Sequence, residues 1–178
     1  MKNDMKERII REAVDIAAFE GIDKLTMSYL AERTDLAKSS LYHYFRTKEE
    51  ILETVYQRGH RSLMSNGFRI RLDKGEHEVL KDAARHWKKL FSSDEDVPFL
   101  RMVFANRFTD QRASEEYNAL ILMLRSQSDV ILQKHGAFIS LLFSSLLLSE
   151  LTGLLEGTDA DLEKSAEDFS ALLESHSL

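Results

Sequence analysis

Apolar residues recur three and four positions apart along most of this chain, and few residues interrupt that spacing. The 178 residues include one proline and seven glycines, and no β-branched run alternates with polar residues as a strand would. One such helical run is Leu80, Ala83, Ala84, Trp87, Leu90 and Phe91. We therefore predict an all-α protein.

Capping signals divide the first part of the chain into four helices. Asp4 and Glu7 have the spacing of a capping box, Thr26 can cap a second helix, and Thr47 with Glu50 forms another capping box. Gly21 can take a left-handed conformation at the end of the first helix. The predicted helices are Met5–Glu20, Met27–Arg33, Lys38–Phe45 and a longer one from Lys48 toward Gly67.

The second and third of these helices are short and only four residues apart, which is the pattern of a helix-turn-helix. Leu41, Tyr44 and Phe45 have the spacing of one helix face and should point to the core. The opposite face then presents hydroxyls, an imidazole and an ammonium, which suit phosphates and base edges. Its residues are Lys38, Ser39, Tyr42 and His43.

The distribution of charge agrees with a nucleic-acid partner, although the net charge is −6. Residues 1–75 carry 14 Lys and Arg against 12 Asp and Glu, whereas residues 76–178 carry 10 against 18. The segment from Leu36 to Lys48 contains Lys38, Arg46 and Lys48 and no carboxylate. Because salt screens distant charge, this local basic face can bind phosphate.

The stretch "TMSYLAERTDLAKSSLYHYFRTKEEIL", from Thr26 to Leu52, resembles the DNA-binding domain of the tetracycline-repressor (TetR) family of bacterial transcription regulators. The resemblance covers about Lys6 to Tyr56 and is carried most specifically by "LYHYF" and "KEEIL". It implies a three-helix head whose third helix enters the major groove, and a fourth helix leading to a helical domain that dimerises and binds an effector. We expect residues 1–48 to be the DNA-binding domain and 49–178 the regulatory and dimerisation domain.

The same resemblance implies roles for individual residues. Groove-facing positions would be Lys38, Ser39, Ser40, Tyr42 and His43, and phosphate contacts would come from Thr26 and Lys48. Two positions depart from the family pattern. Asp35 stands where glycine is usual in the turn, and Ala37 stands where Ser or Thr usually caps the third helix.

The second part of the chain carries a stripe of aromatic residues between Glu76 and Lys134. Such a stripe can be core packing, or it can line a pocket for a mostly apolar effector with an arginine for a carboxylate. Resemblance to the family suggests a cavity among these helices. The predicted pocket residues are Trp87, Phe91, Arg101, Phe104, Arg107, Phe108 and Tyr117.

The stretch from Ala137 to Leu155 has one charged residue, Glu150, and is long enough to span a membrane. Its serines, the lack of basic flanks and the acidic helix that follows favour instead a helix buried on two sides. We expect this helix and the last one to form a four-helix homodimer interface.

These features lead to one functional prediction. We expect a cytoplasmic, homodimeric transcription regulator, most simply a repressor that a small apolar effector releases from a palindromic DNA operator. The alternatives are constitutive or protein-controlled DNA binding and, more distantly, a membrane-tethered interaction protein. The chain has no cysteine, nucleotide-binding loop, nucleophile elbow or metal-ligand motif, so we predict no enzyme activity, metal or cofactor.

Overall fold

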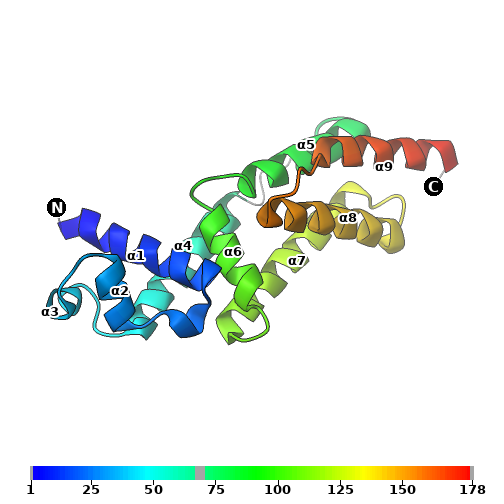
Figure 1. Ribbon diagram of the computed structural model, residues 1–178. Coiled ribbons are helices and arrows are strands. Elements are labelled where there is room, and N and C mark those ends of the chain that lie inside the picture. The colour runs from blue at the N-terminus through cyan, green and yellow to red at the C-terminus, as the bar shows by residue number, and fades with distance from the viewer. Residues whose placement is uncertain (1, 67–70, 177–178) are drawn as a thin grey trace. The chain divides into compact units, whose positions relative to one another are not determined.

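The computed structural model describes residues 2–66 and 71–176 (Figure 1). Within these ranges the chain forms helices and no strand, so the all-α prediction is confirmed. The helices are α1 (Lys2–Phe19), the 3-10 turn η1 (Ile22–Lys24), α2 (Met27–Arg33), α3 (Lys38–Leu41), α4 (Lys48–Asn66), α5 (Glu76–Leu90), α6 (Val97–Asn106), α7 (Gln111–Ile131), α8 (Ala137–Glu156) and α9 (Leu162–His176).

The two ends of α1 differ from the prediction. It begins at Lys2, so Asp4 lies inside the first turn and the predicted Asp4–Glu7 capping box is wrong. The Glu7 carboxylate instead binds the Arg58 guanidinium of α4, at 2.5 and 2.9 Å. Gly21 has the expected positive φ of 97°, but its ψ of 150° lies in an extended region that is also open to glycine.

The bounds of α2 agree with the prediction at both ends. Thr26 Oγ1 accepts a hydrogen bond from the Tyr29 N–H at 3.2 Å, as a helix N-cap should. Asp35 takes the left-handed conformation that the turn requires, with φ 54°. The Leu36 N–H then donates to the Ala31 carbonyl, which satisfies one of the end carbonyls of α2.

The third helix is shorter than predicted. Regular α-helix ends at Leu41, whereas the prediction extended it to Phe45. Beyond Leu41 the chain continues in tighter turns, in which the His43 N–H donates to the Ser40 carbonyl and the Tyr44 N–H to the Leu41 carbonyl. Spacing of apolar residues does not distinguish these three-residue turns from an α-helix, which explains the difference.

The predicted capping box at the start of α4 is present in an altered form. Thr47 Oγ1 accepts from the Glu50 N–H at 3.1 Å, but Glu50 Oε2 accepts from the Arg46 N–H, one residue before the expected partner. The predicted end at Gly67 lies outside the described residues. Midway along α4, Gly59 lies directly against the Phe99 ring of α6, where a Cβ atom would not fit.

The chain folds into two compact units, which are described separately. The first unit contains residues 1–62 and 98–117, and the second contains residues 63–97 and 118–178. The predicted division between residues 48 and 49 concerns function and stays a prediction. In the first unit, α1 to α4 and α6 bury a shared apolar core that includes Ile9, Ile16, Leu30, Leu41, Phe45, Ile51 and Leu100.

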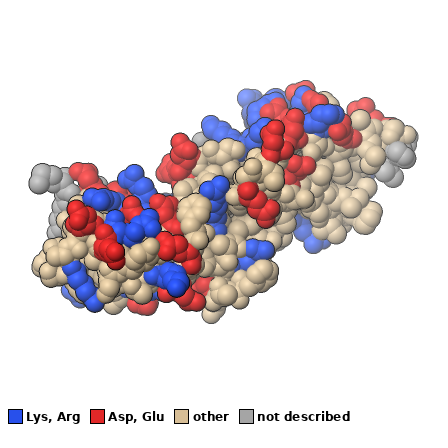
Figure 2. Space-filling view, in the orientation of Figure 1, with Lys and Arg blue, Asp and Glu red and all other residues tan. Residues whose placement is uncertain are grey.

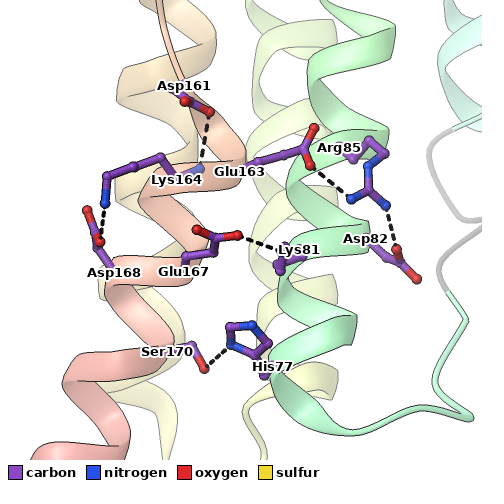
Figure 3. A network of polar contacts seen from close by, with 10 residues as sticks. All are labelled: His77, Lys81, Asp82, Arg85, Asp161, Glu163, Lys164, Glu167, Asp168 and Ser170. Carbon is purple, nitrogen blue, oxygen red and sulfur yellow. Dashed lines mark hydrogen bonds and ion pairs between the residues drawn. The ribbon is translucent and has the colours of Figure 1, made fainter.

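In the second unit, α5 and α9 pack side by side over much of their length (Figures 1 and 3). Lys81 and Arg85 on α5 bind Glu167 and Glu163 on α9, at 2.5 and 2.9 Å. Closer to the C-terminal end of α9, the Ser170 hydroxyl lies 3.0 Å from Nδ1 of His77 on α5. The polar side of α9 is therefore engaged with α5.

Helix α8 supplies the most apolar surface of the second unit. Phe143 is fully buried and its ring lies 5.0 Å from that of Phe169 on α9. In the described residues α8 is the one helix long and apolar enough to cross a membrane, and one third of its most apolar stretch is buried. Such a helix also suits a buried protein interface, so length and composition alone do not decide between them.

Candidate nucleic-acid interface

The candidate interface is the outer side of α3 and the turns that follow it. Leu41 and Phe45 are buried against the head and fix the orientation of this segment. The ammonium of Lys6 on α1 lies 4.9 Å from the centre of the Phe45 ring, which adds a cation–π contact beneath the segment. The predicted inward face of the third helix is thus confirmed at its two most buried positions.

The predicted groove-facing side chains lie on the opposite side. Lys38, Ser39, Tyr42 and His43 are exposed, and Ser40 is half-buried. Tyr42 is 45% exposed, which is high for a large aromatic side chain and leaves its ring available to a partner. The structure therefore leaves a phenol, an imidazole, hydroxyls and an ammonium exposed along α3 and the turns after it, which suits groove binding.

The two predicted phosphate contacts already have partners within the head. Thr26 is exposed, but its hydroxyl is engaged as the N-cap of α2. The ammonium of Lys48 donates to the Ile22 carbonyl at 2.7 Å and is partly buried. Ammonium groups have three donors, so this bond leaves Lys48 capacity for a phosphate at the start of α4.

Arg46 belongs to the predicted basic face, although it was not among the residues predicted individually to contact DNA. It is exposed and follows the turns after α3 by one residue, while its N–H is held by Glu50. The carboxylate-free segment from Leu36 to Lys48 contained the signal that could have identified it. By contrast, the Arg33 guanidinium of α2 is bound to Glu12 and Glu20, both at 3.0 Å. These carboxylates offset its positive charge, so Arg33 adds little positive potential at the candidate interface.

The residues predicted to line an effector pocket fall in two groups. Trp87 and Phe91 belong to the second unit, and their rings lie 6.3 Å apart. Trp87 is 1% exposed, and its indole N–H donates to Gln127 Oε1 at 2.8 Å. This pair therefore sits in the core of the second unit.

The other five predicted pocket residues belong to the first unit. Arg101 lies 5.5 Å from the ring of Phe19 on α1. Arg107, just after α6, lies 4.4 to 5.9 Å from the rings of Phe104, Phe108 and Tyr117. Phe108 is 85% exposed. The two arginines are thus stacked on aromatic rings, and a shared pocket for all seven residues stays a prediction.

A short exposed helix, set by a tight turn against two helices of a three-helix head, defines a helix-turn-helix DNA-binding protein. Residues 9–55 match the family described as "Bacterial regulatory proteins, tetR family". The matched segment contains the helix-turn-helix and the start of α4. An "Uncharacterized HTH-type transcriptional regulator" of Haemophilus influenzae is 37% identical over 57 residues, which span 32% of this chain and 30% of that protein.

Solved structures resemble the fold of nearly the whole chain. The TetR-family transcriptional regulator PfmR of Thermus thermophilus has a TM-score of 0.65 at 21% identity, covering 93% of each chain. SmeT, in its complex with triclosan, has a TM-score of 0.64 at 17% identity, covering 97% of this chain and 91% of that one. At these identities the similarity shows the fold alone.

Proposed function

We propose that this protein is a sequence-specific DNA-binding transcription regulator that binds a palindromic operator as a homodimer. The observation that carries the proposal is the outer side of α3, where Lys38, Ser39, Tyr42 and His43 are exposed above the buried Leu41 and Phe45. A rigid base with small and polar side chains above it allows close approach of the backbone to a major groove.

In this proposal each side chain has a distinct task. His43 and Tyr42 approach the base edges and the sugar–phosphate wall, while Ser39 and Ser40 permit close approach of α3. Lys38 and Lys48 contact phosphates, and we add Arg46 to this set because it is exposed beside them. Thr26 lies at the start of α2, where the N-terminal amides of the helix favour a phosphate.

Dimerisation would use the outer faces of α8 and α9. Four large apolar side chains are 40 to 70% exposed there, namely Phe138, Leu141, Leu142 and Leu172. Figure 2 shows few charged atoms over α8, whereas blue and red atoms gather over α5 and α9. An exposed apolar stripe of this kind usually marks a protein interface, and two copies together would form a four-helix bundle.

We further propose that the protein acts in the cytoplasm as a repressor that a small, mostly apolar effector releases from DNA. The aromatic residues of α5, α6 and α7 support an apolar ligand, with Arg101 or Arg107 for a carboxylate. An effector of this kind acts only if its affinity differs between DNA-competent and incompetent states.

One observation favours the alternative, in which a protein partner controls DNA binding or the protein binds constitutively. Trp87 is almost fully buried and its N–H is already satisfied by Gln127, as expected of a core residue. A screen for compounds that release DNA, followed by Trp87 fluorescence, tests the predicted pocket, and a screen that finds no such compound favours the alternative. Release with a changed Trp87 emission supports the predicted pocket, and release with unchanged emission places the effector elsewhere.

DNA binding itself is tested by recovering genomic fragments with the purified protein and sequencing them. We expect fragments that share one palindromic sequence. His43→Ala should change the preferred bases, whereas Lys48→Ala should weaken binding to all sequences alike. Recovery of no enriched duplex by the folded wild-type protein would reject the proposed function.

A further inference from the structure

The side chain of Asn106, the last residue of α6, is buried deep in the first unit, where it is 4% exposed. Its Oδ1 accepts a hydrogen bond from the Ile22 N–H at 3.1 Å. Its Nδ2 donates to the Ala17 carbonyl and to the Met102 carbonyl, both at 2.8 Å. Both amide hydrogens and one oxygen lone pair are therefore used.

Two of these partners are backbone groups that α1 and η1 leave unsatisfied. Ala17 lies in the last turn of α1, where carbonyls lack a helical partner, and Ile22 begins η1, where the N–H lacks one. Buried groups of this kind cost free energy unless a side chain or water satisfies them. Asn106 satisfies both groups, although it lies 84 positions after Ile22 in the chain.

The other backbone group of Ile22 is held as well. Its carbonyl accepts from the ammonium of Lys48, at the start of α4. Ile22 is thus fixed by Asn106 on its N–H, at 3.1 Å, and by Lys48 on its carbonyl, at 2.7 Å. The segment between α1 and α2, which carries Thr26 and leads into the helix-turn-helix, is tied to α6 and α4.

We propose that Asn106 is a positioning residue for operator binding. Its hydrogen bonds to Ala17 and Ile22 hold the end of α6 against the segment between α1 and α2, a connection that we call the lock. Helix α6 begins at Val97 in the second unit and continues into the first. A dimer binds a palindrome only if both heads are held at one spacing, so a lock between the head and α6 matters for the palindrome. A single half-site needs only one folded head. This inference rests on the proposed function.

The test compares wild-type protein, Asn106→Leu and the matched control Gln127→Leu. Gln127 is also a buried amide, 9% exposed, but it lies in the second unit and accepts from Trp87. The DNA is the operator recovered from the genome, as the full palindrome and as a single half-site duplex. All measurements use a temperature at which circular dichroism shows each variant folded and light scattering shows its assembly unchanged.

Asn106→Leu should weaken binding to the palindrome at least tenfold and binding to the half-site less than threefold. Gln127→Leu should change neither by more than threefold. Equal losses on both duplexes would show a merely structural role for Asn106, and unchanged affinity for the palindrome would show no role. Either result overturns the proposal.

Amide hydrogen exchange tests the hydrogen bond between Asn106 and the Ile22 N–H in the absence of DNA. In Asn106→Leu the exchange of the Ile22 amide should rise at least tenfold, while that of the Leu41 and Phe45 amides stays within threefold of wild type. Unchanged Ile22 exchange would overturn the lock itself. If instead the wild-type protein binds no duplex while Ile22 responds as expected, the proposed function fails and the positioning role fails with it, although the lock stands.

Discussion

At the scale of single residues, Ala37 leaves the start of α3 without a side-chain cap. It stands at the N-cap of α3 in the extended conformation typical of caps, with φ −59° and ψ 141°, and has no side-chain acceptor. The first amides of α3 therefore lack the partner that Ser or Thr would supply. The departure noted in the sequence is a real feature of the structure.

Ala37→Thr should raise the free energy of unfolding by about 1 kcal/mol, because the new hydroxyl can accept from an amide of the first turn of α3. Ala37→Val has nearly the same shape without the acceptor and is the control. The measurement is urea denaturation of both variants. Equal stability of the two would contradict the capping explanation.

Asp15 on α1 is a second residue with a predictable effect. Burial, followed by the nearby Glu12 carboxylate, raises the pKa of Asp15 above its usual value of 3.8, although Arg33 and Arg11 oppose the shift. The folded state thus holds the proton more tightly than the unfolded state. The contribution of Asp15 to stability is present below pH 3.8 and is lost as the pH rises through the raised pKa.

Asp15→Asn should therefore stabilise the protein at pH 7.5, by less than about 1 kcal/mol because the site is only half-buried. The gain should shrink at pH 4.5. Urea denaturation at both pH values measures it, with the exposed Asp94→Asn as control. A loss of stability at pH 7.5 would show that the attraction of Arg33 and Arg11 to the Asp15 carboxylate outweighs its burial.

At the scale of helices, sequence reasoning located elements better than it located their ends. The bounds of α2 were predictable because Thr26 and the following turn are local signals. The length of α3 was not, since apolar spacing is similar in α and 3-10 turns. The role of Asn106 was also out of reach, because its partners Ala17 and Ile22 are 89 and 84 positions away.

The packing of α8 against α9 should depend on apolar burial more than on the ion pairs of α9 with α5. Phe143→Ala removes a fully buried ring and should lower the free energy of unfolding by about 3–5 kcal/mol. Lys81→Met, which breaks the partly exposed pair with Glu167, should leave the unfolding midpoint almost unchanged. A larger effect of Lys81→Met than of Phe143→Ala would contradict this account.

At the scale of the whole molecule, the proposed dimer predicts a mass of twice 20.5 kDa by light scattering at micromolar concentration. Leu142→Glu places a charge on the exposed apolar face of α8 and should shift the protein toward monomer. Leu122→Glu is the control, since Leu122 is 65% exposed on α7, outside the proposed interface. A monomeric wild-type protein would contradict the dimer, and purification only in detergent would favour the membrane alternative.

The salt dependence of operator binding tests the central proposal most directly. Affinity should fall steeply between about 50 and 200 mM salt, as counterions leave the DNA. Lys38→Ala should reduce the slope of log affinity against log salt by about 1, whereas Lys134→Ala, an exposed lysine of the second unit, should leave it unchanged. Binding that does not depend on salt, or a slope that Lys38→Ala and Lys134→Ala change equally, would contradict the assignment of α3 as the DNA-binding surface.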